Sequence, residues 1–301
     1  MTTATLSPSK TDTLPTRLLG KTGERIPILG LGTGPGGMGM PNDEAVELYH
    51  QAIDMGVTYI DTAPGYERAQ EQLGEVLSER RDEVFIVTKT FTADGGKALE
   101  ILEENLKTLG VDHVDLVFVH HMGGQDVDTV LSKGGSLAAL REAQRRGWTR
   151  YVGFTSHNQP WKSQKVLEEA EVDAIMLAMN FVDRHTYNFE NEVLPLANER
   201  NVGVAAMKIY GGAKDMNYHP QNQPSQLASA GSHDHHQALR YGLGLPGVAV
   251  AVVGMYTVKE LKQNIEWARN FEPLSSEEEA GLLERGRAVA QQWGAHYGPV
   301  K

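Results

Sequence analysis

Residues 57–90 read VTYIDTAPGYERAQEQLGEVLSERRDEVFIVTKT and predict a strand, a helix and a second strand. Residues 57–60 and 84–87 are short apolar runs, whereas residues 68–79 carry apolar side chains at helical spacing. Continuous apolar strands are typical of a parallel sheet that is buried on both faces. The stretch is therefore one unit of an α/β fold.

The same alternation extends along the chain in both directions. Strands are expected at 28–33, 57–60, 84–87, 114–119, 149–154, 174–179, 202–207 and 248–253. Helices are expected at 43–55, 68–79, 97–109, 136–146, 161–170, 190–200, 235–243 and 257–269. A β-hairpin around residues 20–23 precedes these units, and an extra C-terminal helix at 275–292 follows them. Eight units in sequence favour an α/β fold of the single (β/α)8 TIM barrel type over a two-domain open sheet.

Composition narrows the function classes. With 40% hydrophobic and 22% charged residues, the chain has enough apolar side chains for a sizeable core. A formal net charge of −11 argues against nucleic acid and anionic membranes as partners. The absence of cysteine excludes disulfides, thiolate nucleophiles and cysteine-bound zinc.

The first residues differ from the rest of the chain. Residues 1–15 are rich in Ser and Thr and contain no apolar segment of the kind found in secretory signals, so we expect a disordered leader before a barrel domain at 16–301. The longest apolar stretch, near residues 248–253, is far shorter than the roughly 20 residues that span a bilayer. We therefore expect a cytoplasmic protein.

A glycine motif offers an alternative to the barrel. Residues 32–37 fit G-x-G-x-x-G after a strand, and Asp61 ends the next strand, as in a dinucleotide-binding fingerprint. However, an open sheet does not predict eight units, and Pro35 interrupts the transition from strand to helix. We therefore expect a flexible glycine loop over the barrel mouth.

Four polar residues follow neighbouring strands: Asp61, Tyr66, Lys89 and His120. In a barrel they lie at the C-terminal strand ends, where active sites form. A Lys ammonium stabilises a tyrosine phenolate and lowers the phenol pKa, while an aspartate holds the lysine charged. A neutral histidine can orient a carbonyl oxygen. This set is suited to protonating a carbonyl oxygen while a hydride reaches the carbon.

From residue 17 to about residue 270 the chain resembles the aldo-keto reductase family. The strings RLLGKTG and IPILGLGTG resemble its opening hairpin and first strand, and DTAPGY at 61–66 matches its Asp-Thr-Ala-x-x-Tyr signature. The resemblance implies an NADPH- or NADH-dependent reduction of aldehydes or ketones. It assigns Tyr66 as proton donor, Lys89 and Asp61 as its tuning groups, His120 as substrate-orienting, and His121 as a substrate-pocket residue.

The resemblance also assigns cofactor contacts. The expected set is Gly32, Thr33, Asp61, Thr155, Ser156, Met207, Lys208, Gly254, Met255, Tyr256, Glu260, Gln263 and Asn264. Thr155 and Ser156 stand where the family has a Ser-Asn pair for the carboxamide. Met207 replaces a tyrosine that stacks on the nicotinamide, an Ala-Met-Lys version that resembles one bacterial branch of the family. Lys208 follows it, within reach of the pyrophosphate.

Two positions bear on the choice between NADPH and NADH. Gly254 and Glu260 replace cations that are typical of family members holding a 2′-phosphate. Glu260 is suited to a bare ribose hydroxyl, which favours NADH, but Thr257-x-x-Glu260 also forms a helix capping box. The family as a whole favours NADPH, whereas these two residues weaken that preference. The choice between NADPH and NADH therefore remains open.

Other hypotheses also remain. The polar loop 217–236 ends in Ser-His-Asp-His-His, a composition that suits a lid over the cofactor or a metal site. A metal-dependent barrel hydrolase would use His113, His120, His121 or His157. A cofactor-binding regulatory subunit is a non-enzymatic alternative, although the intact tetrad favours catalysis. The sequence does not indicate the physiological substrate or the oligomeric state.

Overall fold

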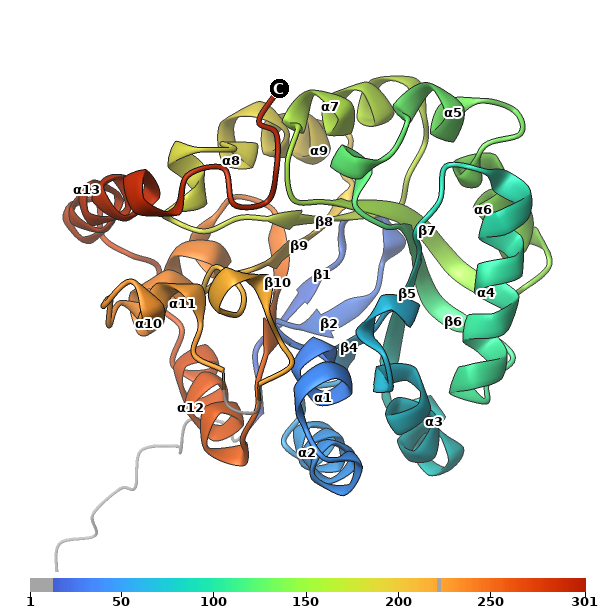
Figure 1. Cartoon of the computed structure of the whole chain (residues 1–301), viewed down its shortest axis with the longest axis horizontal. Helices are drawn as coiled ribbons and strands as arrows, with labels where there is room; N and C mark the ends of the chain where they lie inside the picture. The colour runs from blue at the N-terminus through green and yellow to red at the C-terminus, as the bar shows by residue number, and fades with distance from the viewer. Residues whose placement is uncertain (1–12, 221–222) are drawn as a thin grey trace, which may run out of the picture.

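Eight parallel strands close into a barrel, with each strand hydrogen-bonded to the next along the chain and β10 returning to β3 (Figure 1). The strands are β3 (Leu29–Gly32), β4 (Tyr59–Asp61), β5 (Phe85–Thr90), β6 (Val114–Val119), β7 (Thr149–Ser156), β8 (Ala174–Ala178), β9 (Gly203–Met207) and β10 (Val248–Gly254). The computed structural model describes residues 13–220 and 223–301. The expected (β/α)8 barrel is confirmed.

Helices surround the barrel and cover the outer face of the strands (Figure 1). They are α2 (Asn42–Asp54), α3 (Ala69–Arg80), α4 (Gly95–Leu109), α5 (Val127–Leu131), α6 (Ser136–Arg145), α7 (Pro160–Glu169), α8 (Phe189–Glu192), α9 (Leu194–Glu199), α10 (Gln226–Ser229), α11 (His235–Gly244), α12 (Val258–Arg269) and α13 (Ser276–Trp293). The helix expected at 190–200 is divided into α8 and α9. Pro195 explains the division, because it lacks the N–H that a continuous helix needs.

Local signals explain where the helices start and end. Asp94 caps α4 by accepting a hydrogen bond from the backbone N–H of Lys97, and Gly110 ends the helix at a φ of 65°. Ser275 and Glu278 form a reciprocal capping box at the start of α13. Between such ends, each helix buries an apolar stripe against the strands, as α4 does with Leu102 and Leu109.

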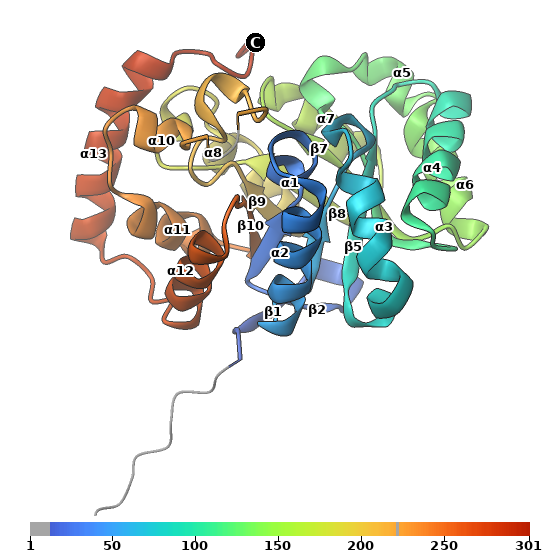
Figure 2. The same ribbon diagram turned by 60° about the horizontal axis from the view of Figure 1, so that its bottom comes forward.

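The N-terminal hairpin packs on one end of the barrel. β1 (Thr16–Leu18) pairs antiparallel with β2 (Arg25–Pro27), and the connecting residue Leu19 is fully buried. The Lys21 backbone N–H donates to the Asn201 carbonyl at 2.7 Å. Figure 2 shows the hairpin at one end of the barrel and the C-terminal residues at the other.

The expected leader overlaps only slightly with the described chain. Residues 1–12 lie outside the described residues. Within 13–15, Leu14 is buried in the core and the Pro15 carbonyl accepts a hydrogen bond from the Ile28 N–H at 3.0 Å. These two residues pack against the barrel.

The glycine-rich segment is a helix, not the flexible loop expected from the sequence. α1 (Gly34–Gly39) is short, and its first four residues are buried. A Cβ on Gly36 would lie 2.0 Å from the Tyr49 hydroxyl, and one on Gly37 would lie 1.9 Å from the Tyr66 carbonyl oxygen. The glycines are therefore required by close packing, and the strands β3–β10 of the described chain form a closed barrel instead of an open dinucleotide-binding sheet.

Candidate active site

The strand register places the predicted residues at one end of the barrel. Gly32 at the end of β3 is level with Asp61 at the end of β4, and Asp61 is level with Val87 on β5. Lys89 lies two residues further along β5, and His120 directly follows β6. The C-terminal ends of three neighbouring strands thus supply Asp61, Lys89 and His120.

Lys89 is the centre of this group. Its side chain is fully buried, and its Nζ lies 2.7 Å from the Asp61 Oδ2 and 3.3 Å from the Tyr66 hydroxyl. Nζ also donates to the Thr62 carbonyl oxygen at 2.9 Å. The lysine therefore joins the carboxylate to the phenol, which is the geometry expected from the sequence.

Burial dominates the electrostatics of these groups. It raises the pKa of Asp61 and lowers the pKa of Lys89, and the attraction between their charges opposes both shifts. Burial also raises the pKa of Tyr66, and the nearby charge of Asp61 raises it further. The net shift of the Tyr66 pKa is therefore opposite to the lowering expected from the sequence, because burial dominates it. Tyr66 therefore holds its proton at neutral pH.

His120 lies beside the Tyr66 phenol. The Tyr66 and His120 rings meet edge to face, with centroids 6.3 Å apart. The backbone N–H of His120 donates to the Thr90 carbonyl at 2.8 Å, and no ring nitrogen of His120 makes a hydrogen bond to a described residue. Burial, followed by the charge of Lys89, places the pKa of His120 well below its ordinary value of 6.5. The imidazole is neutral.

A cavity of about 560 Å³ begins at Asp61 and Tyr66 and extends across the ends of β9 and β10 toward α12. Eleven of the sequence-predicted residues line it: Gly32, Asp61, Tyr66, Met207, Lys208, Gly254, Met255, Tyr256, Glu260, Gln263 and Asn264. Its size is within the ordinary range for small-molecule sites.

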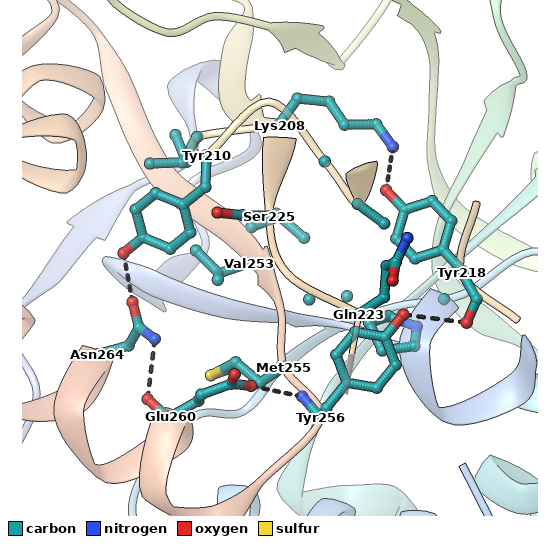
Figure 3. A pocket seen from close by; sticks show the side chains of 18 of the residues that line it. Lys208, Tyr210, Tyr218, Gln223, Ser225, Val253, Met255, Tyr256, Glu260 and Asn264 are labelled. Carbon is teal, nitrogen blue, oxygen red and sulfur yellow. Dashed lines mark hydrogen bonds between the residues drawn. The ribbon is translucent and has the colours of Figure 1, made fainter. Parts of the chain in front are cut away.

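A chain of hydrogen bonds runs around this cavity (Figure 3). Lys208 Nζ donates to the Tyr218 hydroxyl at 2.6 Å, and the Tyr256 hydroxyl donates to the Tyr218 carbonyl oxygen at 3.0 Å. The Tyr256 N–H donates to Glu260 Oε2 at 2.7 Å. These bonds tie the loop after β9 to the end of β10 and to α12.

The series of hydrogen bonds continues along α12. Asn264 Nδ2 donates to the Glu260 carbonyl oxygen at 2.8 Å, and the Tyr210 hydroxyl donates to Asn264 Oδ1 (Figure 3). The Glu260 N–H donates to Thr257 Oγ1 at 3.1 Å, which is one half of the anticipated capping box. The Glu260 carboxylate accepts a hydrogen bond from the Tyr256 N–H and not from the Thr257 N–H, so the other half of the capping box is not formed.

Three predicted cofactor residues do not reach the cavity. Thr33 is fully buried, and its N–H and Oγ1 both donate to the Asp61 carbonyl oxygen. Thr155 accepts a hydrogen bond from the His121 N–H at 2.8 Å, and the Ser156 hydroxyl donates to the Asn158 carbonyl oxygen at 2.9 Å. Their polar groups are used within the chain.

His121 lies in a cluster of rings on the other side of His120. Its Nδ1 is 3.1 Å from the Nδ1 of His157, and Phe91 packs against both His120 and His121. Among the residues that the structure describes, no three His, Asp or Glu side chains are arranged to hold a metal ion.

The polar loop after β9 covers the cavity from one side. Tyr218, Gln223 and Ser225 line the cavity, and His235 accompanies them from the start of α11. His235 Nε2 lies 2.9 Å from the Ser225 hydroxyl, and the His236 ring stacks on Trp267 with centroids 5.3 Å apart. These two histidines therefore contact side chains of the cavity region.

The sequence did not single out Tyr210, Tyr218, Gln223 or Ser225. They follow β9 in a polar segment with neither helical nor strand periodicity. Three of them lie in loop 217–236, whose polar composition suggested a lid or a metal site. A further signal was the position of the segment after a barrel strand, since loops at this end carry function.

Comparisons with known proteins show which family the chain resembles. A family model described as "Aldo/keto reductase family" matches residues 28–284. Pyridoxal 4-dehydrogenase from Microbacterium luteolum is 24% identical, over 83% of this chain and 92% of the relative.

Two solved structures are also similar. A thermostable aldo-keto reductase, Tm1743, determined with the inhibitor epalrestat, is 27% identical with a TM-score of 0.72, covering 90% of this chain and 99% of that one. The holo form of the aldo-keto reductase AKR11C1 from Bacillus halodurans shares the fold, with a TM-score of 0.74 at 20% identity and coverage of 95% and 100%.

A closed α/β barrel with polar residues gathered at its C-terminal strand ends is typical of an enzyme. The chain belongs to the aldo/keto reductase family. It is accordingly an oxidoreductase that acts on carbonyl compounds, in a family that uses nicotinamide cofactors. In the described part of the chain, no helix is long and apolar enough to cross a membrane.

Proposed function

We propose that this protein reduces aldehyde or ketone carbonyls to alcohols by hydride transfer from NADPH or NADH, with Tyr66 as the proton donor. The observation that carries the proposal is the position of Lys89 Nζ, 2.7 Å from Asp61 Oδ2 and 3.3 Å from the Tyr66 hydroxyl, at one end of a large cavity. Residues 16–301 act as one domain in this proposal.

The cavity lining fits a nicotinamide nucleotide. At the α12 end, the lining includes the amide of Gln263 and the ring of Trp267, which suit a purine base. Lys208 contributes an ammonium to the lining, which suits the charge of a diphosphate, and Met207 contributes a polarisable thioether that can pack on a flat ring.

The glycine positions support the same fit. A Cβ on Gly254 would lie 2.8 Å from Pro35 Cγ, so the β10 end and α1 approach closely at the cavity wall. Gly32 faces the same wall and carries no side chain into the cavity. Backbone is thereby left accessible for a bound nucleotide.

The proposed chemistry assigns a task to each tetrad residue. A bound nicotinamide nucleotide supplies the hydride that reaches the carbonyl carbon. As negative charge develops on the carbonyl oxygen, the Tyr66 hydroxyl transfers its proton there, because an alkoxide is a stronger base than a phenolate. The Lys89 ammonium stabilises the resulting Tyr66 phenolate, and the Asp61 carboxylate holds Lys89 charged.

His120 orients the substrate in this scheme. A neutral imidazole retains one N–H, and that group can donate a hydrogen bond to the carbonyl oxygen. Because the ring makes no hydrogen bond to a described residue, this donor is available. In this proposal, the His120 ring and the Tyr66 hydroxyl both bind the carbonyl oxygen of the substrate.

Nucleotide binding provides the direct test. Trp267 lines the cavity, so its fluorescence should be quenched when NADPH or NADH is titrated, with calorimetry as an independent check. Saturable binding with a defined ratio of affinities supports the proposal. Absence of binding for both nucleotides would overturn it.

A further inference from the structure

The backbone carbonyls of three tetrad residues are each held by a polar side chain from outside the tetrad. The donor and acceptor pairs are Thr33 Oγ1 to Asp61 at 3.0 Å, Asn105 Nδ2 to Lys89 at 3.0 Å, and Gln125 Nε2 to His120 at 3.1 Å. All three donating side chains are buried. We call Thr33, Asn105 and Gln125 the supporting residues.

The Lys89 carbonyl depends on a side chain because the neighbouring strand has ended. The Thr62 N–H, just after β4, donates to the Val87 carbonyl on β5 at 2.9 Å. Carbonyls two residues apart on a strand face the same neighbour, so the Lys89 carbonyl also faces the β4 side. The next donor there would be residue 64, and Pro64 has no N–H. Asn105 Nδ2 supplies the donor that the backbone lacks.

The position of Asn105 on its helix points to the same role. It lies on the buried face of α4, at helical spacing from Leu102 and Leu109. Asparagine is mostly exposed in proteins, and an apolar side chain at this place would continue the apolar stripe of the helix. The bond to the Lys89 carbonyl explains why an amide stands there.

His120 is held in the same way one strand further along the barrel. Its N–H donates to the carbonyl of Thr90, the last residue of β5, at 2.8 Å. The His120 carbonyl faces the same side and therefore lies beyond the end of β5, where Gln125 Nε2 donates to it. Gln125 is itself fixed, because its backbone carbonyl accepts a hydrogen bond from Lys162 Nζ at 2.7 Å.

The Asp61 carbonyl receives more than the sheet requires. The Thr33 N–H, just after β3, donates to it at 2.9 Å and so continues the ladder of the two strands. The Thr33 hydroxyl adds a second hydrogen bond to the same oxygen. The backbone bond already satisfies this carbonyl, so the hydroxyl bond acts on its orientation.

From this pattern we infer that Thr33, Asn105 and Gln125 are positioning residues for the tetrad. They fix the backbone of Asp61, Lys89 and His120 at the strand ends and thereby set where the reacting side chains lie. The 3.3 Å between Lys89 Nζ and the Tyr66 hydroxyl depends on such control, because a displacement of about 1 Å at a reacting group lowers a rate about 10²-fold. The inference rests on the proposed function for the reaction that this geometry serves.

The position of the Lys89 ammonium can be followed without any turnover. It is fully buried and hydrogen-bonded to Asp61, Thr62 and Tyr66, so its protons exchange slowly and give a resolved NMR signal in the full chain with isotope-labelled lysine. The loss of one signal in Lys89→Met identifies it. Asn105→Leu keeps the approximate shape of the side chain and removes the donor, so this signal should shift or broaden.

A matched control separates positioning from the general loss of an amide. Asn198 Nδ2 donates to the Pro246 carbonyl at 2.9 Å, near the starts of β9 and β10 at the other end of the barrel. Asn198→Leu should therefore leave the Lys89 signal in place. An unchanged Lys89 signal in folded Asn105→Leu, or an equal shift in both variants, would overturn the inference.

Kinetics should divide the supporting residues by the group that each one holds. Asn105→Leu should lower kcat about 10²-fold with nucleotide affinity retained, because neither Asn105 nor Lys89 lines the cavity. Gln125→Leu acts through His120, so the KM for the carbonyl compound should rise while the Lys89 signal stays. Activity losses that only follow the loss of stability in urea unfolding, with no such division, would contradict a positioning role.

Thr33 offers the mildest variants, which test the inference even where the leucine variants do not fold. Thr33→Val keeps the side-chain shape and the backbone hydrogen bond and loses only the hydroxyl. Its kcat should fall, Thr33→Ser should restore it, and nucleotide affinity should be the same in both, since Thr33 does not line the cavity. Equal kcat in the valine and serine variants would overturn the role of the hydroxyl.

The two proposals fail in different ways. A wild-type protein that reduces no carbonyl compound would reject the proposed function, whereas the Lys89 signal would still decide whether Asn105 positions the lysine. Carbonyl reduction that is unchanged in Asn105→Leu, together with an unmoved Lys89 signal, would reject the positioning role and leave the proposed function standing.

Discussion

Lys208 Nζ lies 2.6 Å from the hydroxyl of Tyr218, so a cation at the end of β9 holds a residue of the loop that covers the cavity. Lys208 adopts a φ of 58°, and the ammonium lies 5.0 Å from the Tyr218 ring centroid. The Tyr218 carbonyl is held separately by Tyr256, and a Cβ on Gly39 would lie 2.2 Å from that carbonyl oxygen. One tyrosine therefore connects β9, β10 and α1.

Replacing Tyr218 with Phe should loosen this connection. The variant loses a hydrogen bond to a charged group, and such bonds contribute about 1.5–3 kcal/mol. We expect the nucleotide to dissociate about tenfold faster, measured by stopped-flow fluorescence. Tyr151→Phe, near the hairpin at the opposite end, is the control and should leave the rate unchanged. An unchanged rate in Tyr218→Phe would show that the loop does not limit release.

Replacing Tyr66 with Phe should separate binding from chemistry. Nucleotide affinity should be retained, because the change removes one oxygen at the far end of the cavity from α12. Carbonyl turnover should fall by about 10²–10⁴-fold, the usual contribution of a positioned acid. The control is Tyr59→Phe, because the Tyr59 hydroxyl is buried in the barrel and has no partner among the described residues. Undiminished turnover in Tyr66→Phe would remove Tyr66 as the acid.

The nucleotide preference should depend on the charge of Glu260. Its carboxylate bonds the Tyr256 N–H at the cavity wall, and a 2′-phosphate placed nearby is repelled by it. Glu260→Gln keeps an acceptor for that N–H but removes the charge, so the affinity for NADPH relative to NADH should rise about fivefold. Glu266→Gln, on the same helix but outside the cavity lining, is the matched control for titrations at low salt. A ratio that moves equally in both variants would argue against a local effect.

A buried carboxyl away from the site should make stability depend on pH. Burial raises the pKa of Glu190 from 4.5 to about 8, although Arg184 opposes the shift. Between these values the folded chain keeps a proton that the unfolded chain has lost, so unfolding releases a proton and is favoured as pH rises. The stability contributed by this group is complete below pH 4.5 and is lost as pH rises through about 8.

Urea unfolding measured between pH 5 and pH 8 checks this prediction. Glu190→Gln should reduce the decline in the free energy of unfolding by up to about 1.4 kcal/mol per pH unit. Glu192→Gln, an exposed position on the same short helix, should keep the wild-type slope. The same slope in wild type and Glu190→Gln would show that Glu190 does not titrate in this range.

The barrel could be predicted from the sequence, because its strands are local apolar runs and its helices have clear periodicity and caps. It was also sufficient to bring Asp61, Lys89 and His120 together, since parallel strands share one C-terminal edge. It was wrong about α1, because the need for glycine arises from contacts with Tyr49 and with the Tyr66 backbone, which are distant in the chain.

Tertiary contacts explain the remaining differences. The direction of the Tyr66 pKa shift is set by burial, which a local motif does not report. Thr155 and Ser156 occupy the expected positions on β7, yet their hydroxyls are engaged by neighbouring backbone groups. The role of Tyr218 in the lining depends on a polar loop that returns over the cavity, and such a path has no periodic signature.

The packing of the N-terminal hairpin against the barrel has a consequence for the entry and release of ligands. With Leu19 fully buried and the Lys21 N–H bonded to the Asn201 carbonyl, the hairpin covers that end of the barrel. On the proposed function, nucleotide and substrate would both enter at the C-terminal strand ends, where the Lys208–Tyr218 contact lies. On the same proposal, release of one ligand from the shared opening would limit the exchange of the other, and turnover would depend on the rate of that release.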